Sequence, residues 1–149
     1  SYSLAGARLG FAVGSKELIH DLNTIKYSVN PYNVNRMSCA AGYAALCEKD
    51  YYAALCEKIV ANRQYTIDAL RKMGFSVLES KANFVLAKSD RISGQELYTK
   101  LKERGILVRH FSKKRIEEYN RITIGSKAEM ENFLENIRKI LEETDEQSL

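Results

Sequence analysis

The sequence predicts an α/β protein in which helices cover one face of a small β-sheet. Two observations lead to this prediction. Apolar residues recur at helical spacing in five segments of the chain, which is typical of amphipathic helices. In the second half, short apolar runs rich in β-branched and aromatic residues come between these segments and are typical of strands. Residues 75–149 thus predict a compact α+β layer in the order β-β-α-β-β-α, and helices with one strand precede it.

Composition and charge limit the class of protein. The 149 residues, 45% hydrophobic and 28% charged, suffice for one ordinary domain, or for a small domain and a piece of another. The 23 basic and 19 acidic residues are interspersed, so the net charge of +4 does not predict a nucleic-acid partner. The basic cluster at residues 113–115 is typical of a solvated loop. The sequence contains no run of about 18 apolar residues that would predict a membrane span, and it opens with no secretory signal.

Cysteine and histidine usage argues against disulfides and against a metal site. The three cysteines are odd in number and show no Cys-x-x-Cys spacing, which favours reduced thiols in a cytosolic protein. His20 and His110 lie far apart in the sequence and lack neighbouring ligand residues. We therefore expect no bound metal.

The chain opens with a turn of small residues and a predicted strand. The stretch SYSLAGARLGFAVG places Arg8 among Ala and Gly residues, which let a ligand approach the backbone, and arginine offers a planar set of donors to a phosphate. The same pattern also suits an ordinary tight turn with Arg8 in a salt bridge, so these residues alone leave both interpretations open. The apolar residues 9–13 predict the strand.

Three helices are expected next. Ser15 should cap the first, which ends near Tyr27. After a loop that contains the only proline, Asn33 or Asn35 should cap a second helix rich in alanine. Asp50 is the expected cap of the third, which ends at a glycine. At about 35 Å, this third helix is long enough to bridge two domains.

The second half of the chain predicts the sheet and its helices. Four apolar runs predict strands at residues 75–77, 83–87, 106–111 and 121–125. Ser93 should cap the helix between the second and third strands. Ser126, followed three residues later by Glu129, forms a capping box for the last helix.

Two arginines lie on predicted strands. Arg109 interrupts the apolar run ILVRHF, and Arg121 begins the run RITIG. A half-buried sheet has one polar face, so both side chains could simply lie on the surface. Alternatively, both project from one sheet edge toward an anion, because arginine makes bidentate contacts with carboxylate and phosphate that lysine does not. The segment by itself does not decide between these interpretations.

Five segments, in their order along the chain, carry a resemblance to a known family: SYSLAGARLGFAVG, PYNVNRMSCAAGYAAL, KANFVLAK, GILVRHF and RITIGSKAEM. They resemble the fold-type I aminotransferases that use pyridoxal phosphate, and among these the histidinol-phosphate aminotransferases. The resemblance implies that Arg8 binds the cofactor phosphate. It also implies that Arg109 and Arg121 bind substrate anions and that Asn83 lines the active site. The implied enzyme is a homodimer of histidine biosynthesis, and its substrates are histidinol phosphate or imidazole-acetol phosphate and glutamate or 2-oxoglutarate.

The sequence departs from this family in one respect. The family's Schiff-base lysine lies a few positions before the arginine matched by Arg8, at a position just before Ser1. Because the chemistry needs that amine, we expect an inactive fragment that by itself binds no cofactor. Residues 1–49 are expected to be the end of the large cofactor-binding domain, and residues 50–149 the bridging helix and the small domain. The strand at residues 9–13 should then pair with another chain, or the first part should rearrange against the small domain.

Other interpretations stay open. Threonine-phosphate decarboxylases and aromatic aminotransferases share much of the same pattern. Outside the enzymes, the chain could be a standalone, non-catalytic module that binds an anion or a peptide. A nucleic-acid module is least favoured, because no single strand interleaves basic and aromatic residues along one face.

Overall fold

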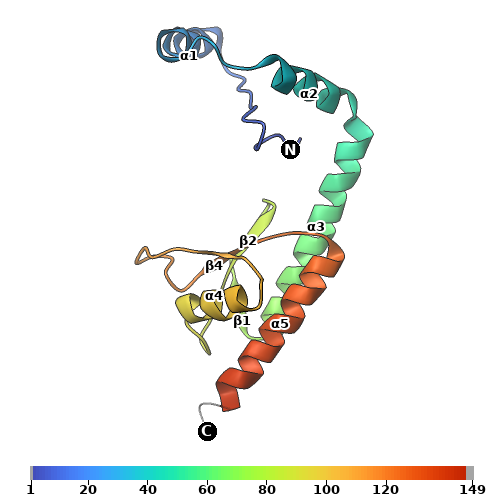
Figure 1. Cartoon of the computed structure of the whole chain (residues 1–149), viewed down its shortest axis with the longest axis vertical. Coiled ribbons are helices and arrows are strands. Elements are labelled where there is room, and N and C mark those ends of the chain that lie inside the picture. The colour runs from blue at the N-terminus through green and yellow to red at the C-terminus, as the bar shows by residue number, and fades with distance from the viewer. Residues whose placement is uncertain (1, 147–149) are drawn as a thin grey trace. The chain divides into compact units, whose positions relative to one another are not determined.

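The computed structural model describes residues 2–146, and the chain divides into two compact units, Ser1–Cys56 and Glu57–Leu149. The junction lies inside a long helix. The elements, in chain order, are α1 (Lys16–Val29), α2 (Arg36–Cys47), α3 (Lys49–Lys72), β1 (Phe75–Val77), β2 (Phe84–Ser89), α4 (Gly94–Glu103), β3 (Arg109–His110), β4 (Asn120–Thr123) and α5 (Lys127–Glu146) (Figure 1). The assignment of residues 1–49 and 50–149 to a large and a small domain stays a prediction.

Side-chain caps begin the first two helices where the sequence predicts them. The Ser15 hydroxyl accepts a hydrogen bond of 3.3 Å from the backbone N–H of Leu18. Asn35 Oδ1 accepts one of 2.8 Å from the backbone N–H of Ser38. Each cap satisfies a donor that the first turn of its helix leaves without a partner.

The predicted cap of the third helix is wrong. α2 ends at Cys47, Glu48 caps its C-terminus, and α3 begins at Lys49. Asp50 therefore lies inside the first turn of α3, because the connection between the two helices is only one residue long. Its carboxylate still stabilises the helix there, since a negative charge complements the positive end of the helix dipole.

The strand predicted at residues 9–13 is also wrong, because these residues form neither helix nor strand. Phe11 and Val13 are 80% and 89% exposed. A strand needs a neighbour to satisfy its backbone N–H and C=O groups, and the strands that the structure describes all lie in the unit Glu57–Leu149. Leu9 packs instead on Gly42 of α2, where a Cβ would lie only 2.4 Å from Leu9 Cδ2. That another chain pairs with residues 9–13 stays a prediction.

The second unit contains a four-stranded antiparallel sheet in the order β1-β2-β4-β3. Burial alternates along β2, where Val85 and Ala87 are buried while Phe84 and Leu86 are half-buried. Successive side chains of a strand point to opposite faces, so one face of the sheet is covered and the other is partly open. This arrangement confirms the predicted α/β layer.

Helices α3, α4 and α5 cover the buried face of the sheet. Figure 1 shows α5 alongside the C-terminal part of α3, and side chains of both helices line a surface groove. The predicted capping box of α5 is present, with the Ser126 N–H donating to Glu129 Oε2 over 2.7 Å. The core they enclose contains Ile67, Leu70, Phe75, Val85, Ala87, Ile92, Leu97, Leu101, Ile122, Ile124, Met130, Phe133, Leu134, Ile137, Ile140 and Leu141.

The third strand is much shorter than predicted. β3 consists of Arg109 and His110 alone, instead of residues 106–111. The backbone N–H of Ile106 donates over 2.9 Å to the carbonyl of Leu101, so the start of the predicted strand belongs to the end of α4. An edge strand has a neighbour on one side only, so the backbone of β3 pairs with β4 alone.

Candidate anion-binding site

Antiparallel pairing places the two predicted arginines directly opposite each other. Arg109 of β3 pairs with Arg121 of β4, so their side chains share one face of the sheet. On the other side, Arg121 pairs with Leu86 of β2, which puts both arginines on the open face. Arg109 is exposed, whereas Arg121 is half-buried.

Each of these arginines lies over an aromatic ring. The Arg121 guanidinium carbon is 5.3 Å from the centre of the Phe84 ring, and that of Arg109 is 5.6 Å from the Phe111 ring. Such cation–π contacts hold a guanidinium plane in place without using its N–H donors. The donors therefore stay available for a ligand.

The charges of this pair are uncompensated. Like charges directly opposite on neighbouring strands destabilise a sheet, and within residues 2–146 neither Arg109 nor Arg121 forms an ion pair. In addition, Arg121 Nε is buried and has no hydrogen-bond partner among the described residues. An anion between the two guanidinium groups would compensate the paired positive charges by accepting charge-assisted hydrogen bonds from their terminal nitrogens. This arrangement favours the anion-binding interpretation over simple surface placement.

Asn83 lies at one end of the same strand pair. It is exposed and directly precedes β2, and its backbone carbonyl accepts a hydrogen bond of 2.8 Å from the N–H of Ile124. The next pair along the ladder is Phe84 with Thr123. The backbone thus places Asn83 near the strand ends, and its side-chain role stays a prediction.

Arg8, in the first unit, lies in a tight turn against α2. Its backbone has a φ of 56°, and its N–H donates to the carbonyl of Ala5 over 3.1 Å. The Ser38 hydroxyl donates to the carbonyl of Ala7 over 3.1 Å, which fastens the turn to α2. Arg8 is exposed, and its guanidinium group donates a hydrogen bond of 3.5 Å to the Ala5 carbonyl. It forms no ion pair with any described residue, so the ordinary salt bridge considered from the sequence is not formed here, and its donors suit a phosphate.

Reasoning from sequence missed the aromatic partners of this face. Phe84, Phe111 and Tyr119 lie under Arg121, Arg109 and Lys88 respectively, with Lys88 Nζ 5.8 Å from the Tyr119 ring centre. Phe84 and Tyr119 could not be found in this way, because each contacts a cation from a distant part of the chain that the strand register brings close. Phe111 lies only two residues after Arg109, so the spacing of the run ILVRHF was the one available signal.

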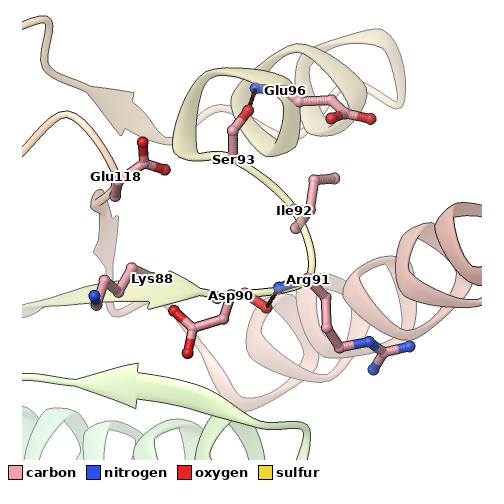
Figure 2. Close-up of a pocket in the computed structure, with 8 residues that line it drawn as sticks. Lys88, Asp90, Arg91, Ile92, Ser93, Glu96 and Glu118 are labelled. Atoms are coloured by element: carbon pink, nitrogen blue, oxygen red, sulfur yellow. Dashed lines mark hydrogen bonds between the residues drawn. The ribbon is translucent and has the colours of Figure 1, made fainter.

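A second concave region lies between the end of β2 and the start of α4 (Figure 2). It carries charges of both signs, including Lys88, Asp90 and Glu118. Several of its polar groups already have partners: the N–H of Gly94 donates to Glu118 Oε2 over 3.2 Å, and that of Glu96 donates to the Ser93 hydroxyl over 3.2 Å. We assign no ligand to this pocket.

Between residues 2 and 146, His, Cys, Asp and Glu side chains form no group of three or more that could hold a metal ion. None of the helices over the same residues is long and apolar enough to cross a membrane.

Sequence comparison identifies relatives along most of the chain. The family model for aminotransferase class I and II matches residues 1–137. The chain is 45% identical over 141 residues to histidinol-phosphate aminotransferases of Clostridium botulinum (strain Okra / Type B1) and Brachyspira hyodysenteriae. The aligned part is 95% of this chain, which spans only 40% of the length of each of these relatives.

Solved structures share the fold. Histidinol-phosphate aminotransferase from Clostridium acetobutylicum matches 95% of this chain with a TM-score of 0.79 and 28% identity, over 43% of its own length. The enzyme of that name from Sinorhizobium meliloti, solved in complex with pyridoxal-5'-phosphate, matches 95% with a TM-score of 0.82 and 26% identity, over 39% of its length. L-threonine-O-3-phosphate decarboxylase from Porphyromonas gingivalis matches 73% with a TM-score of 0.62 and 27% identity, over 35% of its length.

Proposed function

The chain belongs to the class I and II aminotransferase family, and from this premise we propose that it is part of a histidinol-phosphate:2-oxoglutarate aminotransferase. Its relatives at 45% identity carry the histidinol-phosphate name, which supports this substrate. Because the chain spans 40% of their length, the proposal assigns the activity to a protein of the relatives' full length. The 149 residues would supply the substrate-anion site and one contact with the cofactor.

The observation that carries the proposal is the opposed pair of Arg109 and Arg121 with the buried, unpartnered Nε of Arg121. The two substrates of the proposed reaction differ in shape, but each presents an anion away from the reacting amine. Glutamate has a side-chain carboxylate, and histidinol phosphate has a phosphate. Two guanidinium groups on one rigid sheet face can bind either anion through paired N–H donors. Asn83, at the end of the same strand pair, is the proposed third contact.

The residues of the first turn fit the phosphate of pyridoxal phosphate. Arg8 has an exposed guanidinium without an acidic partner among the described residues, in a turn of small residues fastened to α2. When bound, this cofactor supplies the carbonyl group that exchanges amines and the ring that withdraws electrons from the substrate carbon. Arg8 would neutralise its phosphate and hold its orientation. The family's Schiff-base lysine has no counterpart at the matching distance within this chain, so we propose that the 149 residues alone do not transaminate.

The assembly is also part of the proposal. Residues 1–49 would complete the large domain, residues 50–149 would form the bridging helix and the small domain, and two full-length copies would make a cytosolic homodimer. The exposed apolar residues of the first unit, among them Phe11 and Val13, are the surfaces that such an assembly would cover.

A chimera tests this function. The corresponding segment of the Clostridium botulinum relative is replaced by this chain, and amine transfer from histidinol phosphate to 2-oxoglutarate is measured. In an active chimera, Arg121→Gln should raise KM for both substrates. The fall in kcat/KM should correspond to a loss of transition-state stabilisation on the order of 2 to 5 kcal/mol. Arg109→Gln should act in the same direction. Lys113→Gln, which removes the same charge from the neighbouring loop, should leave KM unchanged, and an equal effect from all three variants would contradict the proposal.

The structural likeness to L-threonine-O-3-phosphate decarboxylase supports a second candidate substrate with a phosphate group. The same chimera distinguishes the two reactions, because a decarboxylase releases carbon dioxide from threonine phosphate and needs no 2-oxoglutarate. Carbon dioxide release without amine transfer would replace the first proposal by this one.

A further inference from the structure

We propose that Arg63 of α3 is a positioning residue for the anion site, because it holds the turn that places the Phe84 ring against the Arg121 guanidinium. This inference rests on the anion-binding role proposed for Arg121. Arg63 does not touch the ligand itself. It acts through the backbone that precedes β2.

Two neighbouring side chains of α3 contact the backbone at this end of the sheet. Arg63 is half-buried, and its Nη1 donates a hydrogen bond of 2.8 Å to the carbonyl of Ala82. The neighbouring Asn62 donates from Nδ2 to the carbonyl of Gly125 over 2.9 Å. Ala82 precedes β2 and Gly125 follows β4, so adjacent residues of one helix hold the same end of the central strand pair.

The turn before β2 is also held by hydrogen bonds of its own. The Ser80 hydroxyl accepts from the N–H of Ala82 over 3.1 Å and donates to the carbonyl of Phe84 over 2.5 Å. The carbonyl of Asn83 accepts from the N–H of Ile124 over 2.8 Å. With Ala82 fixed by a charged donor, these bonds fix the backbone of Phe84.

Phe84 connects this turn to the anion site. Its ring centre lies 5.3 Å from the Arg121 guanidinium carbon, and Arg121 Nε has no hydrogen-bond partner. The ring is therefore the contact that orients this guanidinium while no anion is bound. Loosening the Ala82 turn would let the ring move, and Arg121 would lose its preorganised direction.

A matched control lies on the same helix. Arg71 also donates to a backbone carbonyl next to the sheet, from Nη2 to Val77 over 3.4 Å, but at the end of β1. A general loss of contact between α3 and the sheet would appear in Arg71 variants as well. An effect transmitted through Phe84 would appear for Arg63 alone.

The experiment uses the full 149-residue chain and the arginine Nε–Hε signals of its ¹H–¹⁵N spectrum, with the Arg121 signal assigned through its loss in Arg121→Lys. Without any anion, Arg63→Met should shift the Arg121 signal, because the ring current of Phe84 changes, and Arg71→Met should leave it in place. In a titration with inorganic phosphate, Arg63→Met should weaken binding by about threefold to tenfold, the effect of one lost hydrogen bond. Arg63→Lys, which keeps a charged donor, should restore most of the affinity.

The outcomes separate this inference from the function on which it rests. If the native chain binds no phosphate but Arg63→Met still shifts the Arg121 signal, the positioning role holds and the anion role fails. If Arg63→Met behaves like Arg71→Met in both measurements, the positioning role is wrong. Should Arg63→Met unfold the chain, Arg63→Gln is compared in the native and Phe84→Leu backgrounds. It should weaken phosphate binding only while the ring is present, and equal losses in both backgrounds would overturn the inference.

Discussion

At the scale of single residues, the β3–β4 pairing brings together like charges and unpartnered polar atoms. A sheet edge with a purely structural role would avoid both. Arg109 and Arg121 oppose each other on the open face. On the covered face, the next pair is His110 with Asn120, and His110 Nδ1 and Asn120 Oδ1 are both buried without partners. Buried unsatisfied polar atoms are rare, and each one calls for an explanation. These two lie on the covered face, one pair along the ladder from the arginines, so the ligand-binding role proposed for this edge depends on the arginine pair.

A second residue-scale feature is the capping box of α5, which makes stability depend on pH. Hydrogen bonds from the Ser126 hydroxyl and backbone N–H lower the pKa of Glu129 from its ordinary value of 4.5. Because the pKa of Glu129 is lower in the folded state than in the unfolded state, the ionised side chain stabilises the fold fully above pH 4.5. This stabilisation is lost as the pH falls through the lowered, folded-state pKa. The difference in urea midpoint between the native chain and Glu129→Gln should therefore shrink on acidification below pH 4.5.

The control for this pH effect is the hydroxyl partner. Ser126→Ala removes the largest cause of the lowered pKa, so the pH dependence assigned to Glu129 should become smaller in this variant. Identical acid profiles for the native chain and Glu129→Gln would show that the capping box makes no such contribution.

At the scale of elements, the N-terminus of α4 is fixed by an unusually close backbone approach. A Cβ on Gly94 would lie 2.6 Å from the carbonyl oxygen of Glu117 and 2.8 Å from that of Glu118. Gly94→Ala should therefore destabilise the second unit by about 1 to 3 kcal/mol, because the backbone has to move. Gly10→Ala has open space around it and should change the urea midpoint little. Equal midpoints for both variants would show that the approach is not rigid.

The helices and the covered sheet could be predicted from sequence because their signals are local. Ser15, Ser93 and Ser126 mark helix starts through side-chain geometry within one turn. The limits of β3 could not be predicted, because the N–H of Ile106 can donate either to a neighbouring strand or to the carbonyl of Leu101. Tertiary packing determines which of the two hydrogen bonds forms, and in the structure the acceptor is Leu101. The prediction of a strand at residues 9–13 is wrong for a related reason. An apolar run forms a strand only where a neighbouring strand exists to pair with it.

The candidate site was only partly predictable. Arg109 and Arg121 could be identified as a possible pair, but their direct opposition follows from a register that the sequence does not state. The contacts of Arg63 and Phe84 were missed altogether, because each depends on residues distant in the chain. The resemblance to a family proposed roles for Arg8 and Asn83, and those roles stay predictions.

At the scale of the whole molecule, the two units differ in how much they bury. α1 has no buried residue, whereas six residues of α5, including Ile137 and Ile140, are buried. Local opening is easiest where few apolar contacts have to break. In hydrogen exchange measured by mass spectrometry, the amides of α5 should exchange at least about a hundredfold more slowly than those of α1. Similar rates in both helices would mean that the first unit has a core of comparable stability.

The order of strands in the sheet also has a consequence for biosynthesis. The central pair joins β2 to β4, whereas β1 and β2 are consecutive hairpin partners. While a ribosome is making the chain, β2 can pair with β1 early but has an open edge until β4 has emerged, and α4 is made in between. Closure of that long loop has an entropic cost that delays pairing. The nascent second unit therefore exposes a hydrophobic strand edge during this interval, when chaperone protection is needed most.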